Sequence, residues 1–266
     1  MGKSVTASDS HGRRVTRPDL AVVAVLLAIA AAAWVSTAVR MAGMDAGLWT
    51  YPTDVGLYIT TWIVMLAAMM FPSMAPMVLA YERTAPSDRA PRTAVGMTGV
   101  FVAGYLALWS AAGLMAYALL RLGTALDSRP FTGGAAGRYV AAGVILAAVA
   151  YELAPPKRAC LDMCCAPFTF LRESRHDGSA GALRTGLKCG AWCVGCCWAL
   201  MAALFALGVM SLTWMILISV LIMADKLLPS RRLATFGVAS VLAALAIGLL
   251  VGAPISTMSG HGGAPM

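Results

Sequence analysis

From Gly190 to Ala224 the chain carries no charged side chain. As a single α-helix, at about 1.5 Å per residue, this run would far exceed the roughly 30 Å of hydrocarbon in a bilayer. We therefore predict that it folds as a hairpin of two apolar helices that turns near Gly208, Ser211 and Thr213. The whole chain fits a membrane setting, because 60% of its residues are hydrophobic and 12% are charged, against about 25% charged in soluble proteins.

Seven apolar stretches follow one another along the sequence, so we predict an all-α fold: a polytopic membrane bundle of about seven transmembrane helices. The stretches are residues 20–41, 55–79, 95–120, 139–153, 190–210, 211–228 and 233–251. The fourth and the sixth are shorter than the about 20 residues that a span needs. The first has too long an apolar core for a cleavable signal peptide.

The basic residues predict the orientation of the bundle. With the N-terminus in the cytoplasm, most of the 20 Lys and Arg residues fall on the cytoplasmic side, and Arg40, Arg121, Arg129 and Arg138 lie outside. This asymmetry is the positive-inside signal, so we predict a multi-pass protein of the cytoplasmic (inner) membrane. The net charge of +8 then reflects topology, and the expected partner is the lipid bilayer, with no nucleic acid.

The same reading divides the chain into three parts. Residues 1–19 are predicted to form a disordered cytoplasmic tail, because they are rich in Ser, Thr and Arg. Residues 20–252 form a single transmembrane domain, which includes a Cys-containing cytoplasmic loop at 155–188. Residues 253–266 form a flexible C-terminal tail.

Four thiols stand where the charge-free run begins, at Cys189, Cys193, Cys196 and Cys197. At about 100° per residue they share one helix face, roughly a third of the circumference wide. One or two cysteines on such a face would fit plain helix packing, since a free Cys behaves as a small apolar residue. Four thiols that face one point instead favour a bound ligand.

Three more thiols, Cys160, Cys164 and Cys165, lie in the loop before this run. Cys160 and Cys164 are four residues apart, so they share a face of a short interfacial helix bounded by Pro167. On the predicted topology all seven cysteines lie toward the cytoplasm, which keeps thiols reduced. Metal binding or redox catalysis is therefore favoured over structural disulfides.

Methionines at helical spacing mark the stretch 55–79. Met65 and Met69 are four residues apart, as are Met70 and Met74, so two columns of thioethers run side by side along one flank of the helix. Two prolines in the same stretch remove amide donors and free carbonyls that a neighbour or a ligand can use. Methionine is also a common gap filler in apolar cores, so packing and ligation both stay open.

These sulfur donors indicate a soft metal. Thiolates and thioethers together select Cu(I), while zinc and iron–sulfur clusters also take thiolate ligands. The alternative is a membrane-embedded thiol–disulfide oxidoreductase that uses Cys193 and Cys196 as a Cys-x-x-Cys pair. Because both interpretations stand, the sequence leaves open whether the protein is an enzyme.

The dipeptide Asp225-Lys226 closes the charge-free run. Adjacent opposite charges at a membrane edge usually form a solvated or snorkelling pair, and we predict that role here. The alternative is that Asp225 holds a proton or a cation.

Three stretches resemble the bacterial family described as predicted metal-binding integral membrane proteins, whose activity is uncharacterised. They read W-x2-M-x2-AMM-x-P-x3-PM over residues 62–77, K-R-A-C-L-x2-C-x2-P over 157–167, and G-x6-C-x-G-CCWALM from residue 186. The resemblance implies that the metal is carried by Met65, Met69, Met70, Cys160, Cys164, Cys193, Cys196 and Cys197. Cys165 and Cys189 are extra thiols beside that pattern, and Cys189 enters the candidate site through its helix face alone.

We therefore expect a membrane protein that holds Cu(I) through a Cys/Met cluster. Its role would be copper transport or delivery to a membrane cuproenzyme, with a copper chaperone as a further candidate partner. Thiolates would hold the ion on the cytoplasmic side, and methionines would serve as weaker stepping sites.

Overall fold

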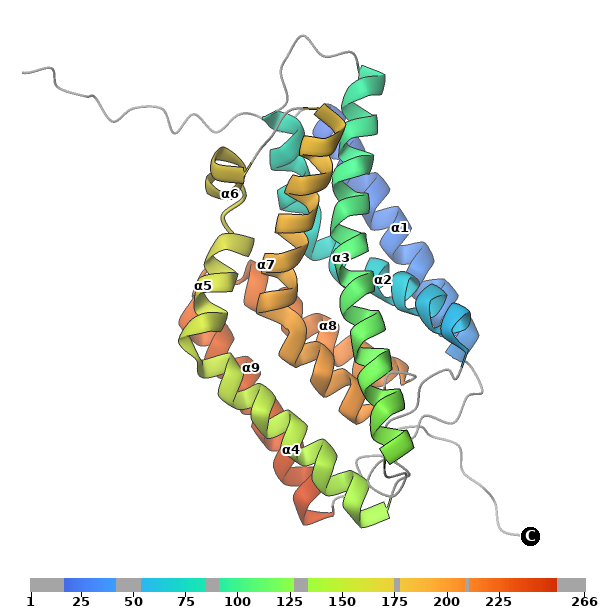
Figure 1. Ribbon diagram of the computed structural model, residues 1–266. Coiled ribbons are helices and arrows are strands. Elements are labelled where there is room, and N and C mark those ends of the chain that lie inside the picture. The colour runs from blue at the N-terminus through green and yellow to red at the C-terminus, as the bar shows by residue number, and fades with distance from the viewer. Residues whose placement is uncertain are drawn as a thin grey trace, which may run out of the picture.

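The computed structural model describes residues 17–41, 54–84, 91–126, 134–174, 178–208 and 211–252. Across these ranges the chain forms nine α-helices and no strand (Figure 1). The helices are α1 (Arg17–Met41), α2 (Val55–Arg83), α3 (Pro91–Leu126), α4 (Gly134–Leu153), α5 (Pro155–Cys164), α6 (Pro167–Ser174), α7 (Gly178–Leu207), α8 (Leu212–Leu227) and α9 (Arg231–Val251). The predicted all-α fold is confirmed. The predicted tails lie outside the described residues, except for the start of α1 within 17–19.

Six of these helices are long and apolar enough to cross a membrane. They cover Leu20–Arg40, Val55–Arg83, Val95–Gly123, Ala136–Leu153, Gly178–Leu207 and Arg231–Val251. The chain is thus a polytopic helical membrane protein. Helix α8 has 16 residues, fewer than the about 20 that an upright span needs. A seventh span and a cytoplasmic N-terminus stay predictions.

The charge-free run folds as the predicted hairpin. Helix α7 ends at Leu207, and α8 begins at Leu212. Gly208 lies at the end of α7 with φ of 109°, a backbone conformation open to glycine and strained for other residues. Thr213, expected in the turn, lies inside α8 instead.

Three pairs of helices pack along one another: α1 and α2 are antiparallel, α4 and α9 are antiparallel, and α3 and α7 run parallel (Figure 1). Glycines bring α3 and α7 close together. A Cβ on Gly104 would lie 2.6 Å from the Leu183 carbonyl oxygen, and one on Gly186 would lie 2.1 Å from the Phe101 carbonyl oxygen. Such contacts leave room for hydrogen alone, so the two backbones touch directly.

Helix α2 contains Pro72 and Pro76, and it changes direction along its length (Figure 1). Pro72 has no amide hydrogen for the carbonyl of Ala68, four residues earlier. The indole Nε1 of Trp34, on α1, donates to that carbonyl over 3.0 Å. The carbonyl freed by the proline is therefore satisfied by a neighbouring helix, one of the two uses that the sequence analysis anticipated.

The stretch 155–188, expected as a loop, is mostly helical. It forms α5 and α6, and α7 begins at Gly178 rather than near residue 190. Pro155 and Pro156 occupy the first positions of α5, where a missing amide hydrogen costs nothing and the fixed φ suits a helix. The prolines that end α4 thus also start α5, which packs against α7.

Candidate metal centre

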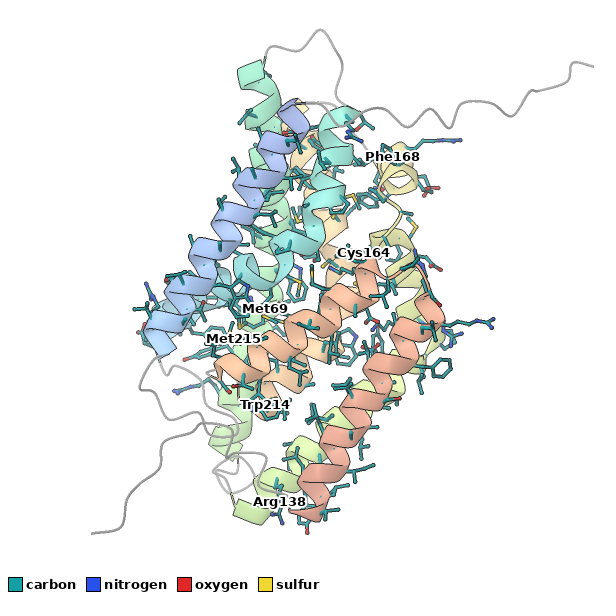
Figure 2. All side chains as sticks on the ribbon, turned by 180° about the vertical axis from the view of Figure 1, so that it is seen from behind. Met69, Arg138, Cys164, Phe168, Trp214 and Met215 are labelled. Carbon is teal, nitrogen blue, oxygen red and sulfur yellow. The ribbon has the colours of Figure 1, made fainter. Side chains whose placement is uncertain are left out.

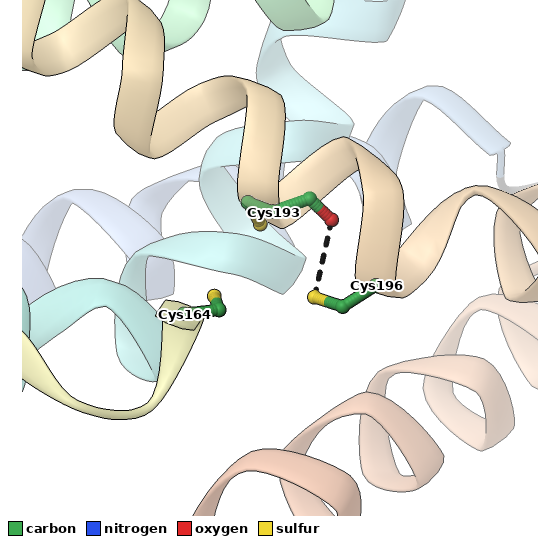
Figure 3. A group of neighbouring side chains, drawn as sticks. All are labelled: Cys164, Cys193 and Cys196. Carbon is green, nitrogen blue, oxygen red and sulfur yellow. Dashed lines mark hydrogen bonds between the residues drawn. The ribbon is translucent and has the colours of Figure 1, made fainter. Parts of the chain in front are cut away.

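Three thiols from two helices converge inside the protein. The Sγ atoms of Cys164, Cys193 and Cys196 all lie within 4.8 Å of one another. Cys193 and Cys196 are each 1% exposed on α7. Cys164, the last residue of α5, reaches toward them from the other side (Figure 3). One thiol of the stretch 155–188 and two thiols of α7 therefore meet at one point.

A tight contact between α5 and α7 positions Cys164. A Cβ added at Gly195 would lie 2.8 Å from Cys160 Sγ, so α5 rests on the bare backbone of α7. On α4, the hydroxyl of Tyr151 donates to the Gly195 carbonyl oxygen over 2.6 Å. Gly195, which lies between Cys193 and Cys196, is thus in direct contact with both α4 and α5.

The other predicted thiols lie beside this group, and Cys197 contacts one of its members. Cys197 Sγ lies 3.3 Å from Cys196 Sγ, and Cys160 is half-buried against Gly195. Cys189 is buried one turn before Cys193. The predicted cysteine face of α7 is confirmed as inward-facing, but only two of its four sulfurs meet the thiol of α5.

The methionines of α2 are also buried. Met65, Met69 and Met70 are at most 1% exposed. Figure 2 shows Met69 of α2 and Met215 of α8 inside the bundle, where these helices pack together. Lys226 of α8 links α2 to the thiols, because its Nζ lies 3.3 Å from Ser73 Oγ of α2 and 3.1 Å from Cys193 Sγ.

Two polar groups flank Cys193 Sγ, and the sequence analysis assigned neither of them. Lys226 Nζ and the Tyr105 hydroxyl each lie 3.1 Å from that sulfur. The ammonium places a positive charge that can offset a thiolate in an apolar interior. The prediction that Asp225-Lys226 is a solvated pair is wrong, because Asp225 is 4% exposed and Lys226 points at the thiols.

The thiols of α5 and its C-cap differ in their proton affinity. A hydrogen bond with Cys164 lowers the pKa of Cys165 to about 7, with help from Lys226 and Arg231 and against the effect of burial. Burial raises the pKa of Cys160. Cys165 therefore loses its proton at a lower pH than Cys160 does. The family resemblance gave Cys165 no role.

The geometry of the three sulfurs suits a metal ion. A metal held at about 2.3 Å by three coplanar thiolates would set their sulfurs about 4 Å apart. Sulfurs already within 4.8 Å of one another need only a small closure to reach that spacing. Three soft donors in a buried, apolar setting are ligands for a soft cation.

The fold and this cluster define a polytopic helical membrane protein with an internal, thiol-based metal-binding centre. Residues 59–249 match the family described as PpoB2, copper chaperone, and the chain belongs to that family. The match runs from α2 to α9 and includes every cysteine of the chain. The same comparisons find no match among curated proteins and none among solved structures.

Proposed function

We propose that the protein binds Cu(I) through the thiolates of Cys164, Cys193 and Cys196 and passes the ion on within the membrane. The observation that carries this proposal is the convergence of one thiol from α5 with two from α7. Membership of a copper-chaperone family supports copper as the cargo.

The donor set favours Cu(I) over the other thiolate clients. Structural zinc and iron–sulfur clusters take four protein ligands, whereas three sulfurs meet here. Cu(I) is a soft ion that thiolates and thioethers select. Cys197, close to Cys196, is the nearest candidate for a fourth ligand, and a zinc-loaded protein would assign it that role.

A relay follows from donors of graded strength. The three converging thiolates are the tightest site, and Cys160 and Cys197 lie next to it as exchange partners. Met65, Met69 and Met70 are weaker thioether sites on α2. The recipient is a membrane cuproenzyme or a further copper chaperone, or the ion is carried across the bilayer.

The proposed setting is the cytoplasmic membrane, with α8 as a seventh, tilted span and the N-terminus in the cytoplasm. Helices α5 and α6 then lie on the cytoplasmic side, where the reducing compartment keeps the thiols ready for copper. The domain spans residues 20–252, with short tails on either side.

Elemental analysis of the anaerobically purified chain tests the proposal. We expect near-stoichiometric copper, and its loss on Cys164→Ser, Cys193→Ser or Cys196→Ser. Cys189→Ser is the matched control, since this thiol is buried on the same helix outside the converging group. Copper that survives in all three single variants, or zinc in place of copper, would contradict the proposal.

The alternative is a thiol–disulfide oxidoreductase that uses Cys193 and Cys196. One observation favours the oxidoreductase: Cys164 lies close to Cys193 and Cys196, where a third thiol could exchange with a disulfide between them. Thiol trapping of metal-free protein separates the two. A reversible bond between Cys193 and Cys196 in the absence of bound copper would support the enzyme.

A further inference from the structure

A second buried cluster joins three helices beside the thiols. The ammonium of Lys157, on α5, forms ion pairs with Glu152 of α4 and with Asp225 of α8. The three side chains are 1%, 0% and 4% exposed, respectively. Neither the family description nor the copper site accounts for them.

The cluster is not neutral when all its groups are ionised. Two carboxylates surround one ammonium, which leaves one uncompensated negative charge in the interior of a membrane protein. A buried charge of this kind is costly unless it is paired or neutralised. A proton bound to one of the two carboxylates would remove this excess negative charge.

The hydrogen bonding shows where neutralisation is missing. The ammonium of Lys157 donates to one oxygen of each carboxylate, namely Glu152 Oε2 and Asp225 Oδ2. The other oxygens, Glu152 Oε1 and Asp225 Oδ1, are buried and accept no hydrogen bond from the described residues. A buried carboxylate oxygen without a donor is an expensive group, and protonation of one carboxyl is the simplest way to relieve it.

The surrounding groups do not supply the missing charge. The titratable groups that act on Glu152 are Lys157 from α5 and Asp225 from α8. Tyr151, the neighbour of Glu152 on α4, donates its hydroxyl to the Gly195 carbonyl of α7. Lys226 points to Cys193 and Ser73. On the start of α9, Arg231 pairs with the exposed Asp162 of α5.

We propose that Glu152, Lys157 and Asp225 form a buried proton-binding site that holds one proton on its carboxyl pair at neutral pH. Ionisation of the site breaks one carboxylic O–H bond and releases that proton to water. The inference goes beyond copper binding, and the proton site does not depend on it. Its position between α5 and α8, which also carry Cys164 and Lys226, suits it to proton-coupled handling of the cargo.

Infrared spectroscopy of the purified, copper-free protein tests the site. A protonated carboxyl shows a carbonyl stretch that a carboxylate lacks, and exposed acids with an ordinary pKa of about 4 are ionised at neutral pH. We expect this band in the wild type at neutral pH. Glu152→Gln and Asp225→Asn should each abolish it, because one carboxylate and one ammonium are already neutral together.

Two further variants separate a proton site from a general effect of substitution. Asp162→Asn removes an exposed acid from the same helix as Lys157 and should leave the band unchanged. Lys157→Gln removes the cation, so both carboxyls must be neutralised and the band should about double. These opposite changes keep the test valid if one variant fails to fold.

Three results would overturn the proposal. They are a wild type without the band at neutral pH, a band that persists in both Glu152→Gln and Asp225→Asn, and a band that is present in a buffer with choline as the salt cation and disappears when sodium replaces the choline. The last would show a sodium site. Copper content, measured on each preparation before the copper is removed for infrared spectroscopy, reports the copper proposal separately, since Cys193→Ser should lose copper and keep the band.

Discussion

The cysteines of α7 and the methionines of α2 look alike in sequence, yet the structure uses them differently. Both sets are sulfur-bearing, buried and spaced for one helix face. The cysteines meet a thiol from a second element, because α5 brings Cys164 to Cys193 and Cys196. The methionines are buried in the contacts of α2 with its neighbours. A regular row of donors on one helix indicates which face is inward. Convergence from another helix is what makes a candidate site.

The largest expected effect is on the cysteine side of this comparison. Cys193→Ser removes a sulfur that contacts Lys226 and Tyr105 and meets the other two thiols. We expect the affinity for Cu(I) to fall more than about tenfold, or about 1.4 kcal/mol. Competition with a Cu(I) chelator measures this loss. An unchanged affinity would mean that the cysteines of α7 bind copper no more than the methionines of α2 do.

The next effect tests how α5 is held against α7. In Gly195→Ala the new methyl group would lie 2.8 Å from Cys160 Sγ, so either the Cys160 side chain rotates away or α5 shifts from α7 together with Cys164. We expect destabilisation of about 1–3 kcal/mol by overpacking together with weaker copper binding. Thermal unfolding in detergent gives the first and chelator competition the second.

A control for that variant exists on α4. Gly143→Ala adds a methyl group to a helical glycine with no neighbouring atom within 4 Å. It should leave copper affinity unchanged and cost little stability. If Gly143→Ala weakens copper binding as much as Gly195→Ala does, contact between α5 and α7 is not what sets the site.

A smaller effect is expected from the charge beside Cys193. Lys226→Met keeps the length of the side chain and removes the ammonium that lies 3.1 Å from the sulfur. Because that charge offsets a thiolate, we expect copper affinity to fall about three- to tenfold, less than on loss of the sulfur itself. Lys226→Arg should restore most of the affinity. A loss in Lys226→Arg equal to that in Lys226→Met would point to packing instead of charge.

The smallest equilibrium effect belongs to the methionine row. Replacing Met65, Met69 and Met70 by Leu conserves apolar volume, so each change should cost less than about 1.5 kcal/mol of stability. Copper stoichiometry at the thiols should not change, while the rate of copper transfer to an acceptor should fall. Stopped-flow transfer to a Cu(I) chelator measures this rate. An unchanged rate would assign the three methionines to packing alone.

The sequence was sufficient for those parts of the molecule that depend on local pattern. Apolar runs predict the helices, and the cysteine spacing predicts the inward face of α7. The prolines after α4 predict a break and a short helix that carries Cys160 and Cys164. The family resemblance and the family match agree on a metal-binding membrane protein.

What the sequence left out depends on contacts between distant segments. Nothing lies within 4 Å of a Cβ built on Gly99 of α3, whereas Gly104 of the same helix packs directly on α7, and the sequence does not tell the two glycines apart. The partners Glu152 and Asp225 are far apart in the chain, and no local pattern pairs them with Lys157. The adjacent opposite charges of Asp225-Lys226 were a signal, but their two side chains serve different clusters.

Helix α5 has ten residues and carries a member of both buried clusters, Lys157 near its start and Cys164 at its end. It begins at a proline and is followed, after Cys165 and Ala166, by Pro167 at the start of α6. A displacement that withdraws Cys164 from α7 as a rigid segment must also withdraw Lys157 from its two carboxylates. Release of a metal ion from the thiols and rearrangement of the carboxyl pair would then occur together, through one movement of α5.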